Sequence, residues 1–267
     1  MKINEFLPFN VTGRALKIIH LNYLMKAKVS VYDIFCSILR NNYIQKGDFV
    51  LSNYGVWLKN NFYDRTFILA LVGYRNGLDK ILLQIKVPTI FIDIGANQGI
   101  FSLIAAKNPH IIEIHSFEPN TLIFKKLQEN VIFNQISNVK LHRVAISKIY
   151  GRVSFSAPNN HSGLGKISSK KTAHVVKSVN KKYLNNIFKN NTHEVFIKID
   201  VEGLEFEVLC ELLDSRLNPK IGNIYLEFNP KYKNRDINLI KLLNQNGFSE
   251  KFRTTHKDYY DSLYSRP

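Results

Sequence analysis

The chain has 267 residues, of which 45% are hydrophobic and 22% charged, so it is not a disordered chain and can form one large domain or a core domain with an appendage. Its two cysteines, Cys36 and Cys210, form no Cys-x-x-Cys pair, which argues against a disulfide framework and a zinc site and favours a reducing compartment. The net charge of +16 favours nucleic acid, anionic lipid or acidic substrates as partners, although an AT-rich genome also enriches lysine.

Residues 1 to about 45 are predicted to be helical, because apolar residues recur at helical spacing between basic ones. Such helices either lie on a membrane surface or pack on the following domain. The N-terminus lacks the apolar core of a secretory signal, and no stretch approaches the roughly 20 apolar residues of a membrane span. We therefore expect a cytoplasmic protein, with peripheral membrane contact through these helices as an open alternative.

Two short strands are predicted on either side of Asn53-Tyr54-Gly55, followed by helices over residues 64–74 and 78–85. With the N-terminal helices they form an extension that we assign to residues 1–86. A second domain is assigned to residues 87–267.

The second domain opens with an apolar strand over residues 89–94, a turn that contains Gly95, Asn97 and Gly99, and a run with helical spacing. A strand, a glycine-bearing turn and a helix start let backbone amides approach a ligand. Asp93, at the end of the strand, would repel a pyrophosphate but suits a cationic ligand such as S-adenosylmethionine. The alternative is a tight turn whose glycines serve only close packing.

Strands and helices alternate after this turn, and two antiparallel strands end the chain. The strands are predicted at residues 111–117, 139–144, 151–156, 194–200, 221–228, 248–254 and 259–264, and the helices at 121–133, 204–213 and 236–246. This alternation predicts an α/β fold with a doubly wound, Rossmann-like sheet.

Ligands of such sheets bind beyond the carboxyl ends of the strands. The residues expected there are mostly acidic, namely Asp93, Glu118, Ala145, Asp200 with Glu202, and Glu227. Converging carboxylates raise one another's pKa, so this arrangement is a liability without a ligand.

Glu118 lies 23 residues after Gly95, close to the ~20-residue offset at which an acidic residue accepts hydrogen bonds from ribose hydroxyls. The turn itself lacks the G-x-G-x-x-G spacing, and the chain has no Gly-Lys-Ser or Gly-Lys-Thr phosphate loop. Both a nicotinamide dehydrogenase and a P-loop enzyme are therefore disfavoured.

Four motifs occur in order along the chain: Asp93-Ile-Gly-Ala-Asn97-Gln-Gly99, Phe117-Glu118-Pro119, Val144-Ala145 and Lys198-Ile-Asp200-Val-Glu202-Gly203-x-Glu205. With these motifs the chain resembles the FkbM-type S-adenosylmethionine-dependent methyltransferases, most strongly between Ile90 and Glu227. The resemblance implies the seven-stranded, Rossmann-like sheet of class I methyltransferases and S-adenosyl-L-methionine as cofactor. It also implies O-methylation of sugar hydroxyls in glycans or secondary metabolites, as in polysaccharide biosynthesis.

Carried over residue by residue, the resemblance assigns the methionine part of the cofactor to the turn, the ribose to Glu118 and the adenine to the region of Ala145. The turn residues concerned are Asp93, Gly95, Ala96, Asn97 and Gly99. One departure is that the family often has Tyr-Glu upstream of the first strand, whereas here Tyr74 is followed by Arg75.

Methyl transfer needs the oxygen, carbon and sulfur atoms in line, and a sugar hydroxyl is a poor nucleophile until a base or a metal ion takes its proton. Asp200 and Glu202 are candidate bases because they follow the strand next to the expected acceptor. His161 is a third candidate base, with a merely solvated histidine as the alternative. We assign no metal, although a magnesium ion at Asp200 and Glu202 stays an alternative.

The segment between Arg152 and His193 contains no Asp or Glu but seven lysines: Lys166, Lys170, Lys171, Lys177, Lys181, Lys182 and Lys189. Because this segment connects two strands, we expect it to overhang the acceptor site and to favour an anionic small-molecule or glycan acceptor. A solvated lysine-rich loop is the alternative.

A nucleic-acid methyltransferase is the second interpretation, since Asn229-Pro-Lys-Tyr232 is similar to the Asn-Pro-Pro-Tyr motif of amino-group methylating enzymes. That motif belongs after the fourth strand and here follows the fifth. The chain also lacks an RNA-binding module, so we expect no nucleic-acid partner. A non-catalytic cofactor-binding or membrane-surface protein is the third interpretation.

Overall fold

The computed structural model describes residues 39–73, 77–158, 161–168, 174–229, 233–256 and 259–267. The chain forms two compact units, one of Met1–Arg75 with Asn159–Ser162 and the other of Asn76–Pro158 with Gly163–Pro267. The helices expected before residue 39 lie outside the described residues, as does Tyr74. The domain boundary expected after residue 86 stays a prediction.

The described part of the first unit contains a small antiparallel sheet and helix α3, besides a helical stretch at residues 39–42. The sheet consists of β1 (Gln45–Lys46), β2 (Phe49–Leu51) and β3 (Trp57–Lys59), in that order. Helix α3 (Arg65–Val72) begins at Asp64, whose carboxylate accepts a hydrogen bond from the amide of Thr66 at 2.9 Å. Such a cap satisfies a backbone donor that the first helical turn leaves unpaired.

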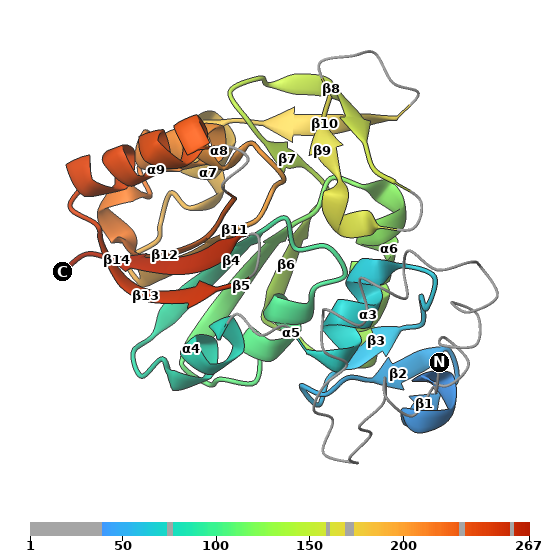
Figure 1. The fold of residues 1–267 in the computed structure, drawn as a ribbon. Coiled ribbons are helices and arrows are strands. Elements are labelled where there is room, and N and C mark those ends of the chain that lie inside the picture. Colours follow the sequence, from blue (N-terminus) through green and yellow to red (C-terminus); the bar gives the residue numbers. More distant parts are fainter. Residues whose placement is uncertain (1–38, 74–76, 159–160, 169–173, 230–232, 257–258) are drawn as a thin grey trace. The chain divides into compact units, whose positions relative to one another are not determined.

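The second unit is built on a seven-stranded sheet with the order β13-β14-β12-β11-β4-β5-β6 (Figure 1). The strands are β4 (Thr89–Ile94), β5 (Ile111–Phe117), β6 (Val139–His142), β11 (Glu194–Ile199), β12 (Ile221–Phe228), β13 (Ser249–Thr255) and β14 (Tyr260–Ser265). All neighbours are parallel except that β14 runs antiparallel to β12 and β13. This sheet confirms the expected doubly wound, Rossmann-like fold.

Helices cover both faces of this sheet. Figure 1 shows α7, α8 and α9 on one face and α4 and α5 on the other. The helices are α4 (Leu78–Gln84), α5 (Ile100–Ala105), α6 (Thr121–Phe133), α7 (Lys181–Ile187), α8 (Glu205–Leu213) and α9 (Lys233–Gln245). The strand order reverses between β4 and β11, and ligands of such sheets bind at this reversal.

The segment that sequence analysis treated mainly as a connection forms a second sheet. Its order is β7-β10-β8-β9, with β7 (Ala145–Ile146), β8 (Gly151–Ser156), β9 (Lys166–Ile167) and β10 (Val175–Val179). Only β8 was expected. The hydrophobic alternation that indicates a strand was obscured here, because β9 and β10 each carry a lysine on the face opposite an apolar residue.

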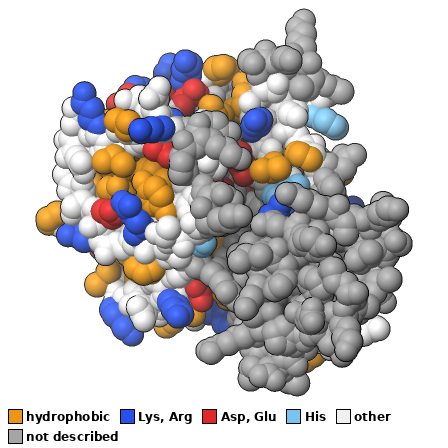
Figure 2. Space-filling view, viewed as in Figure 1, with side chains coloured by type: hydrophobic (Ala, Val, Ile, Leu, Met, Phe, Trp, Pro, Cys, Tyr) orange, Lys and Arg blue, Asp and Glu red, His pale blue; other side chains and the backbone are white. Residues whose placement is uncertain are grey.

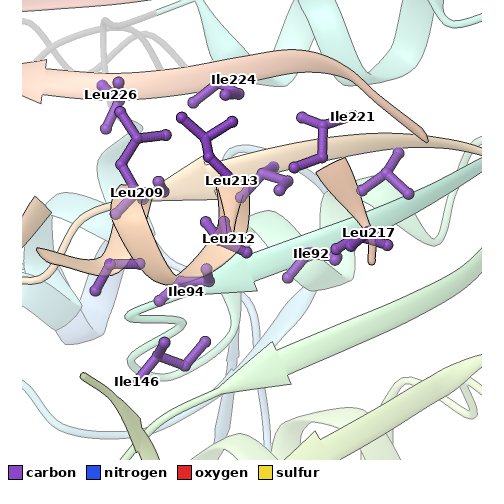
Figure 3. Close-up of a cluster of buried hydrophobic side chains, with 14 of the residues drawn as sticks. Ile92, Ile94, Ile146, Leu209, Leu212, Leu213, Leu217, Ile221, Ile224 and Leu226 are labelled. Atoms are coloured by element: carbon purple, nitrogen blue, oxygen red, sulfur yellow. The ribbon is translucent and has the colours of Figure 1, made fainter. Parts of the chain in front are cut away.

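The main core lies between the large sheet and α8. All six residues of β4 are buried, as expected of a parallel strand covered on both faces. Figure 3 shows Leu209, Leu212 and Leu213 of α8 close to Ile224 and Leu226 of β12, and these side chains are at most 8% exposed. Their spacing along α8 gives the helix one apolar face, and this face fixes the helix that follows β11.

Among the described residues, no helix combines the length and apolar character that crossing a membrane would require.

Candidate functional site

The turn between β4 and α5 lies at the point where the strand order reverses. Gly95, Asn97 and Gly99 all have left-handed backbone conformations, with φ values of 77°, 52° and 86°. A Cβ atom on Gly95 would lie 1.8 Å from the carbonyl oxygen of Asp200. Only glycine fits this position, and the end of β11 therefore lies directly against the turn.

The turn is also fastened to the end of β5. The amides of Gly95 and Ala96 both donate to the carbonyl oxygen of Phe117, at 3.0 and 2.9 Å. The amide of Asn97 donates to Glu118 Oε2 at 3.0 Å. The end of β5 therefore holds the backbone of the turn by hydrogen bonds, and the end of β11 lies against Gly95, before any ligand binds.

Asp93 is completely buried beneath this turn. Its Oδ2 atom accepts a hydrogen bond from Ser102 Oγ at 2.7 Å, and its Oδ1 atom lies 3.2 Å from Lys198 Nζ. Ser102 in turn lies 2.8 Å from the hydroxyl of Ser116. Protein groups therefore surround this carboxylate, and its direct effect is to orient the turn and Lys198.

Lys198 joins the turn to the end of β11. Its Nζ atom donates to the carbonyl oxygen of Gly95 at 2.9 Å and lies 3.5 Å from Asp200 Oδ2. Burial alone would lower the pKa of Lys198, but Asp93 and Asp200 outweigh burial and raise its pKa. The side chain is therefore a buried ammonium that balances two carboxylates.

Glu118 lies at the end of β5 and is only 6% exposed. Its Oε1 atom accepts from the amide of Asn120 at 2.8 Å, opposite the bond from Asn97 to Oε2. Burial raises the pKa of Glu118 to about 7, against the lowering effect of these backbone hydrogen bonds. Each carboxylate oxygen has a second lone pair, so this group can still accept from ligand hydroxyls.

Ala145 belongs to β7 in the small sheet, where it pairs with Ser178. It is 8% exposed and packs with Val153, Phe155 and Val176. The structure thus places it after β6, as expected, and its role toward an adenine stays a prediction.

Asp200 and Glu202 follow β11, on the same edge of the sheet as the turn. The Asp200 side chain is 44% exposed, and Glu202 has a left-handed backbone with φ of 53°. Burial, and then the charges of Asp200 and Glu205, raise the pKa of Glu202 to about 7. A carboxylate with such a pKa can exchange a proton near neutral pH.

Two further acids come to this edge from β12 and β14. Glu227 and Asp261 are directly opposite each other in the antiparallel pair. Burial, and then Asp200 and Asp261, raise the pKa of Glu227 to about 9. Asp261 also lies 2.8 Å from His256 Nε2.

Glu227 was identified from the sequence, where an ion pair of Lys198 with Asp200 or Glu202 was also an open alternative, and Lys198 lies 3.5 Å from Asp200 Oδ2. Asp261, Ser102 and the contacts of Lys198 with Asp93 and Gly95 were not predicted. Asp261 lies early in an antiparallel strand, so the search for strand-end residues does not select it. Ser102 lies inside an apolar helical run, and no sequence signal marks it.

His161 lies in the first unit, where its Nδ1 atom is 3.3 Å from Thr66 Oγ1. Burial, and then Arg65, lower the pKa of His161. Its role as a base stays a prediction. Within the part of the chain that the structure describes, no group of three or more His, Cys, Asp or Glu side chains is placed to hold a metal ion.

The comparison with protein families gives one match. The model of the Methyltransferase FkbM domain matches residues 93–250, which includes the turn, Glu118, Ala145 and the acids after β11. No curated protein matches the chain.

Several solved structures are similar to this chain. A ribosomal protein L11 methylase from Lactobacillus delbrueckii subsp. bulgaricus is 13% identical, with a TM-score of 0.42, over 71% of this chain and 76% of that chain. A precorrin-6y C5,15-methyltransferase from Geobacter metallireducens GS-15 is 13% identical, with a TM-score of 0.43, over 72% and 87%. A putative methyltransferase from Streptococcus mutans in complex with SAH is 12% identical, with a TM-score of 0.44, over 71% and 95%. At these identities, the substrate of this chain has to be argued from its own residues.

Proposed function

Since this chain belongs to the FkbM methyltransferase family, we propose that it methylates a hydroxyl oxygen of a sugar in a glycan, a glycolipid or a secondary metabolite. The family membership makes it a methyltransferase with S-adenosyl-L-methionine as its cofactor. The sugar acceptor and the transfer to oxygen are the parts that are proposed here.

The turn and Glu118 fit such a cofactor. Gly95, Asn97 and Gly99 give the turn its left-handed backbone, and Gly95 has no side chain where the turn lies against the end of β11. We assign the methionine part to Asp93, Gly95, Ala96, Asn97 and Gly99, with Asp93 acting through Lys198 and the turn because its carboxylate is buried. Glu118 is assigned to the ribose and Ala145 to the adenine.

When bound, S-adenosylmethionine supplies a methyl group on a positively charged sulfur. The chain must then hold the acceptor hydroxyl in line and remove its proton. We assign proton removal to Asp200 and Glu202. The observation that carries this assignment is Lys198, whose Nζ atom contacts the turn and lies 3.5 Å from Asp200 Oδ2. The same cation thus fixes the distance between the cofactor turn and the proposed base.

The proposal is tested by methyl transfer from radiolabelled S-adenosylmethionine to a panel of free sugars, sugar phosphates, glycan fragments and RNA. We expect the label in a sugar product. The label should remain under conditions that cleave methyl esters, because such resistance indicates a methyl ether. Label only in RNA would favour the nucleic-acid alternative. Cofactor binding without transfer to any acceptor would favour a non-catalytic role.

Two expectations from the sequence have no described structure to support them. Residues 230–232 of the Asn229-Pro-Lys-Tyr232 motif lie outside the described residues, as do the basic helices before residue 39. The peripheral membrane contact, which depends on those helices, therefore stays a prediction. The cytoplasmic location also stays a prediction.

A further inference from the structure

The high net charge does not by itself select a binding surface. On the face shown in Figure 2, Lys and Arg side chains are spread among acidic and hydrophobic ones over the described surface. A narrower feature lies beside the small sheet, where a pocket of about 450 Å³ is lined by Arg143, Arg152 and Lys177 together with Pro119, Thr121 and Val175. None of its described lining residues is acidic.

The three cations of this pocket come from separate parts of the chain. Arg152 of β8 and Lys177 of β10 are directly opposite each other in an antiparallel pair, so their side chains leave the same face of the small sheet. Like charges at such positions are destabilising. Arg143 adds a third positive charge from the connection after β6. Solvent screens these exposed side chains, and the arrangement favours an anion at this face.

Two other lysines of this segment have acidic neighbours. Lys181 forms an ion pair with Asp214 at 2.9 Å, and the charge of Lys166 acts on Glu202. Lys170 and Lys171 lie outside the described residues. For Arg143, Arg152 and Lys177, the described residues provide no ion pair, and the segment from Arg152 to His193 contains no acid.

The acid nearest to this pocket in sequence does not neutralise it. Glu118 directly precedes Pro119, but it is buried, and its two oxygens accept from the amides of Asn97 and Asn120. The pocket therefore begins where the residues assigned to the cofactor end. A ligand in it would lie beside the cofactor without using the same carboxylate.

We propose that the pocket lined by Arg143, Arg152 and Lys177 binds a phosphate group of the methyl acceptor. This inference rests on the proposed function and specifies its substrate as a phosphorylated, sugar-containing molecule. Arginine and lysine side chains suit phosphate oxygens. The apolar wall at Pro119 and Val175 leaves room for the organic part of the ligand, since small-molecule sites are typically about 300–1,000 Å³.

The test uses the full chain, saturated with S-adenosylhomocysteine so that the cofactor site is filled. Titration calorimetry with inorganic pyrophosphate compares the wild type with the double variant Arg152→Gln/Lys177→Gln. The matched control is Lys189→Gln/Lys220→Gln, which removes the same charge from two exposed lysines outside the pocket. Glucuronate replaces pyrophosphate in a second series to compare a carboxylate with a phosphate.

We expect one pyrophosphate site, weakened at least tenfold in the pocket variant and less than twofold in the control. Glucuronate should bind at least tenfold more weakly than pyrophosphate. Equal affinity in the two double variants, no binding by the wild type, or preference for glucuronate would overturn the proposal. If pyrophosphate binds without S-adenosylhomocysteine but not in its presence, the pocket belongs to the cofactor site, and the proposal is likewise overturned.

Two further measurements separate this inference from the proposed function and from misfolding. The affinity for S-adenosylhomocysteine should stay within twofold of the wild-type value in both double variants. If the wild type does not bind S-adenosylhomocysteine at all, that result counts against the assigned cofactor site and not against the phosphate pocket. If Arg152→Gln/Lys177→Gln fails to fold, the single variant Arg143→Gln gives the same comparison outside the small sheet. A 10-nucleotide RNA that binds the pocket more tightly than pyrophosphate at equal ionic strength would overturn the assignment to a small acceptor.

Discussion

Two pairs of acids lie on the same edge of the sheet but in different surroundings. Asp93 and Glu118 are at the ends of β4 and β5. Glu202 follows β11, and Glu227 lies at the end of β12. Both oxygens of Asp93 face Ser102 or Lys198, and both oxygens of Glu118 accept backbone amides. Burial and, after it, neighbouring carboxylates together raise the pKa of Glu202 to about 7 and that of Glu227 to about 9.

Burial raises the pKa of Glu118 to about 7 as well, but backbone amides hold its oxygens, whereas other carboxylates crowd Glu202 and Glu227. We call the hydrogen-bonded part of the site the fixed side and the part crowded by carboxylates the titratable side. On the β4 and β5 side, hydrogen bonds hold the turn in position before a ligand binds, which lowers the cost of ordering it. On the β11 and β12 side, crowded carboxylates have raised pKa values, as is common for groups that transfer protons.

The largest effect is expected from Gly95→Ala on the fixed side. A Cβ atom there would lie 1.8 Å from the carbonyl oxygen of Asp200, which is backbone and cannot rotate away. We expect cofactor binding to fall below detection in calorimetry with S-adenosylhomocysteine. Gly247→Ala is the matched control, because Gly247 has a similar φ of 80° but nothing within 4 Å of its Cβ position. It should cost only about 1–2 kcal/mol of stability, and equal losses in both variants would contradict the contact between the turn and β11.

Lys198→Met removes the cation that joins the two sides. It leaves Asp93 buried without its ion pair, and breaking a buried pair in this way costs about 3–5 kcal/mol of unfolding free energy. Urea denaturation measures this loss. The double variant Lys198→Met/Asp93→Asn should recover part of the stability because the buried charge is gone. A double variant that is no more stable than the single one would show that the pair is not coupled.

Glu202→Gln changes the titratable side. If Glu202 accepts the proton of the acceptor hydroxyl, kcat should fall on the order of 100-fold, because general bases contribute about 10²–10⁴-fold. In the wild type, kcat should rise as the pH increases through about 7, since the base acts only when deprotonated. The variant should lose this rise. A pH profile of the same shape in the wild type and the variant would exclude Glu202 and leave Asp200 and His161 as the candidate bases.

Glu227→Gln should have the smallest effect at neutral pH, where Glu227 keeps its proton, and that effect should be on stability rather than on chemistry. The folded pKa of Glu227 is about 9 and its ordinary value is 4.5, so the folded state keeps the proton that the unfolded chain releases. The wild type therefore loses stability as the pH rises from about 4.5 through 9. At pH 9 the variant should be more stable than the wild type by at least about 1 kcal/mol, and at pH 4 the two should be similar. Thermal unfolding at both values checks this, and parallel curves would contradict a raised pKa.

Much of the fold was predictable from local pattern. The β5 strand and the α6 helix lie at residues 111–117 and 121–133, where hydrophobic spacing predicts them. The small sheet was mostly missed because β9 has two residues and β10 carries Lys177 and Ser178 between its valines. Short strands with one basic face give little periodic signal, and their pairing with β7 and β8 brings together residues far apart in the sequence.

The candidate site divides in the same way. The sequence alone determined the doubly wound alternation, the glycine turn and the acids at the strand ends, because these depend on short-range spacing and on strand direction. Only the tertiary structure decided that Lys198 contacts Asp93, Gly95 and Asp200, that Asp261 lies opposite Glu227, and that Arg143 lines a pocket with Arg152 and Lys177. These features depend on register between distant strands and on burial, which sets the strength of charge interactions, and neither can be read from neighbouring residues.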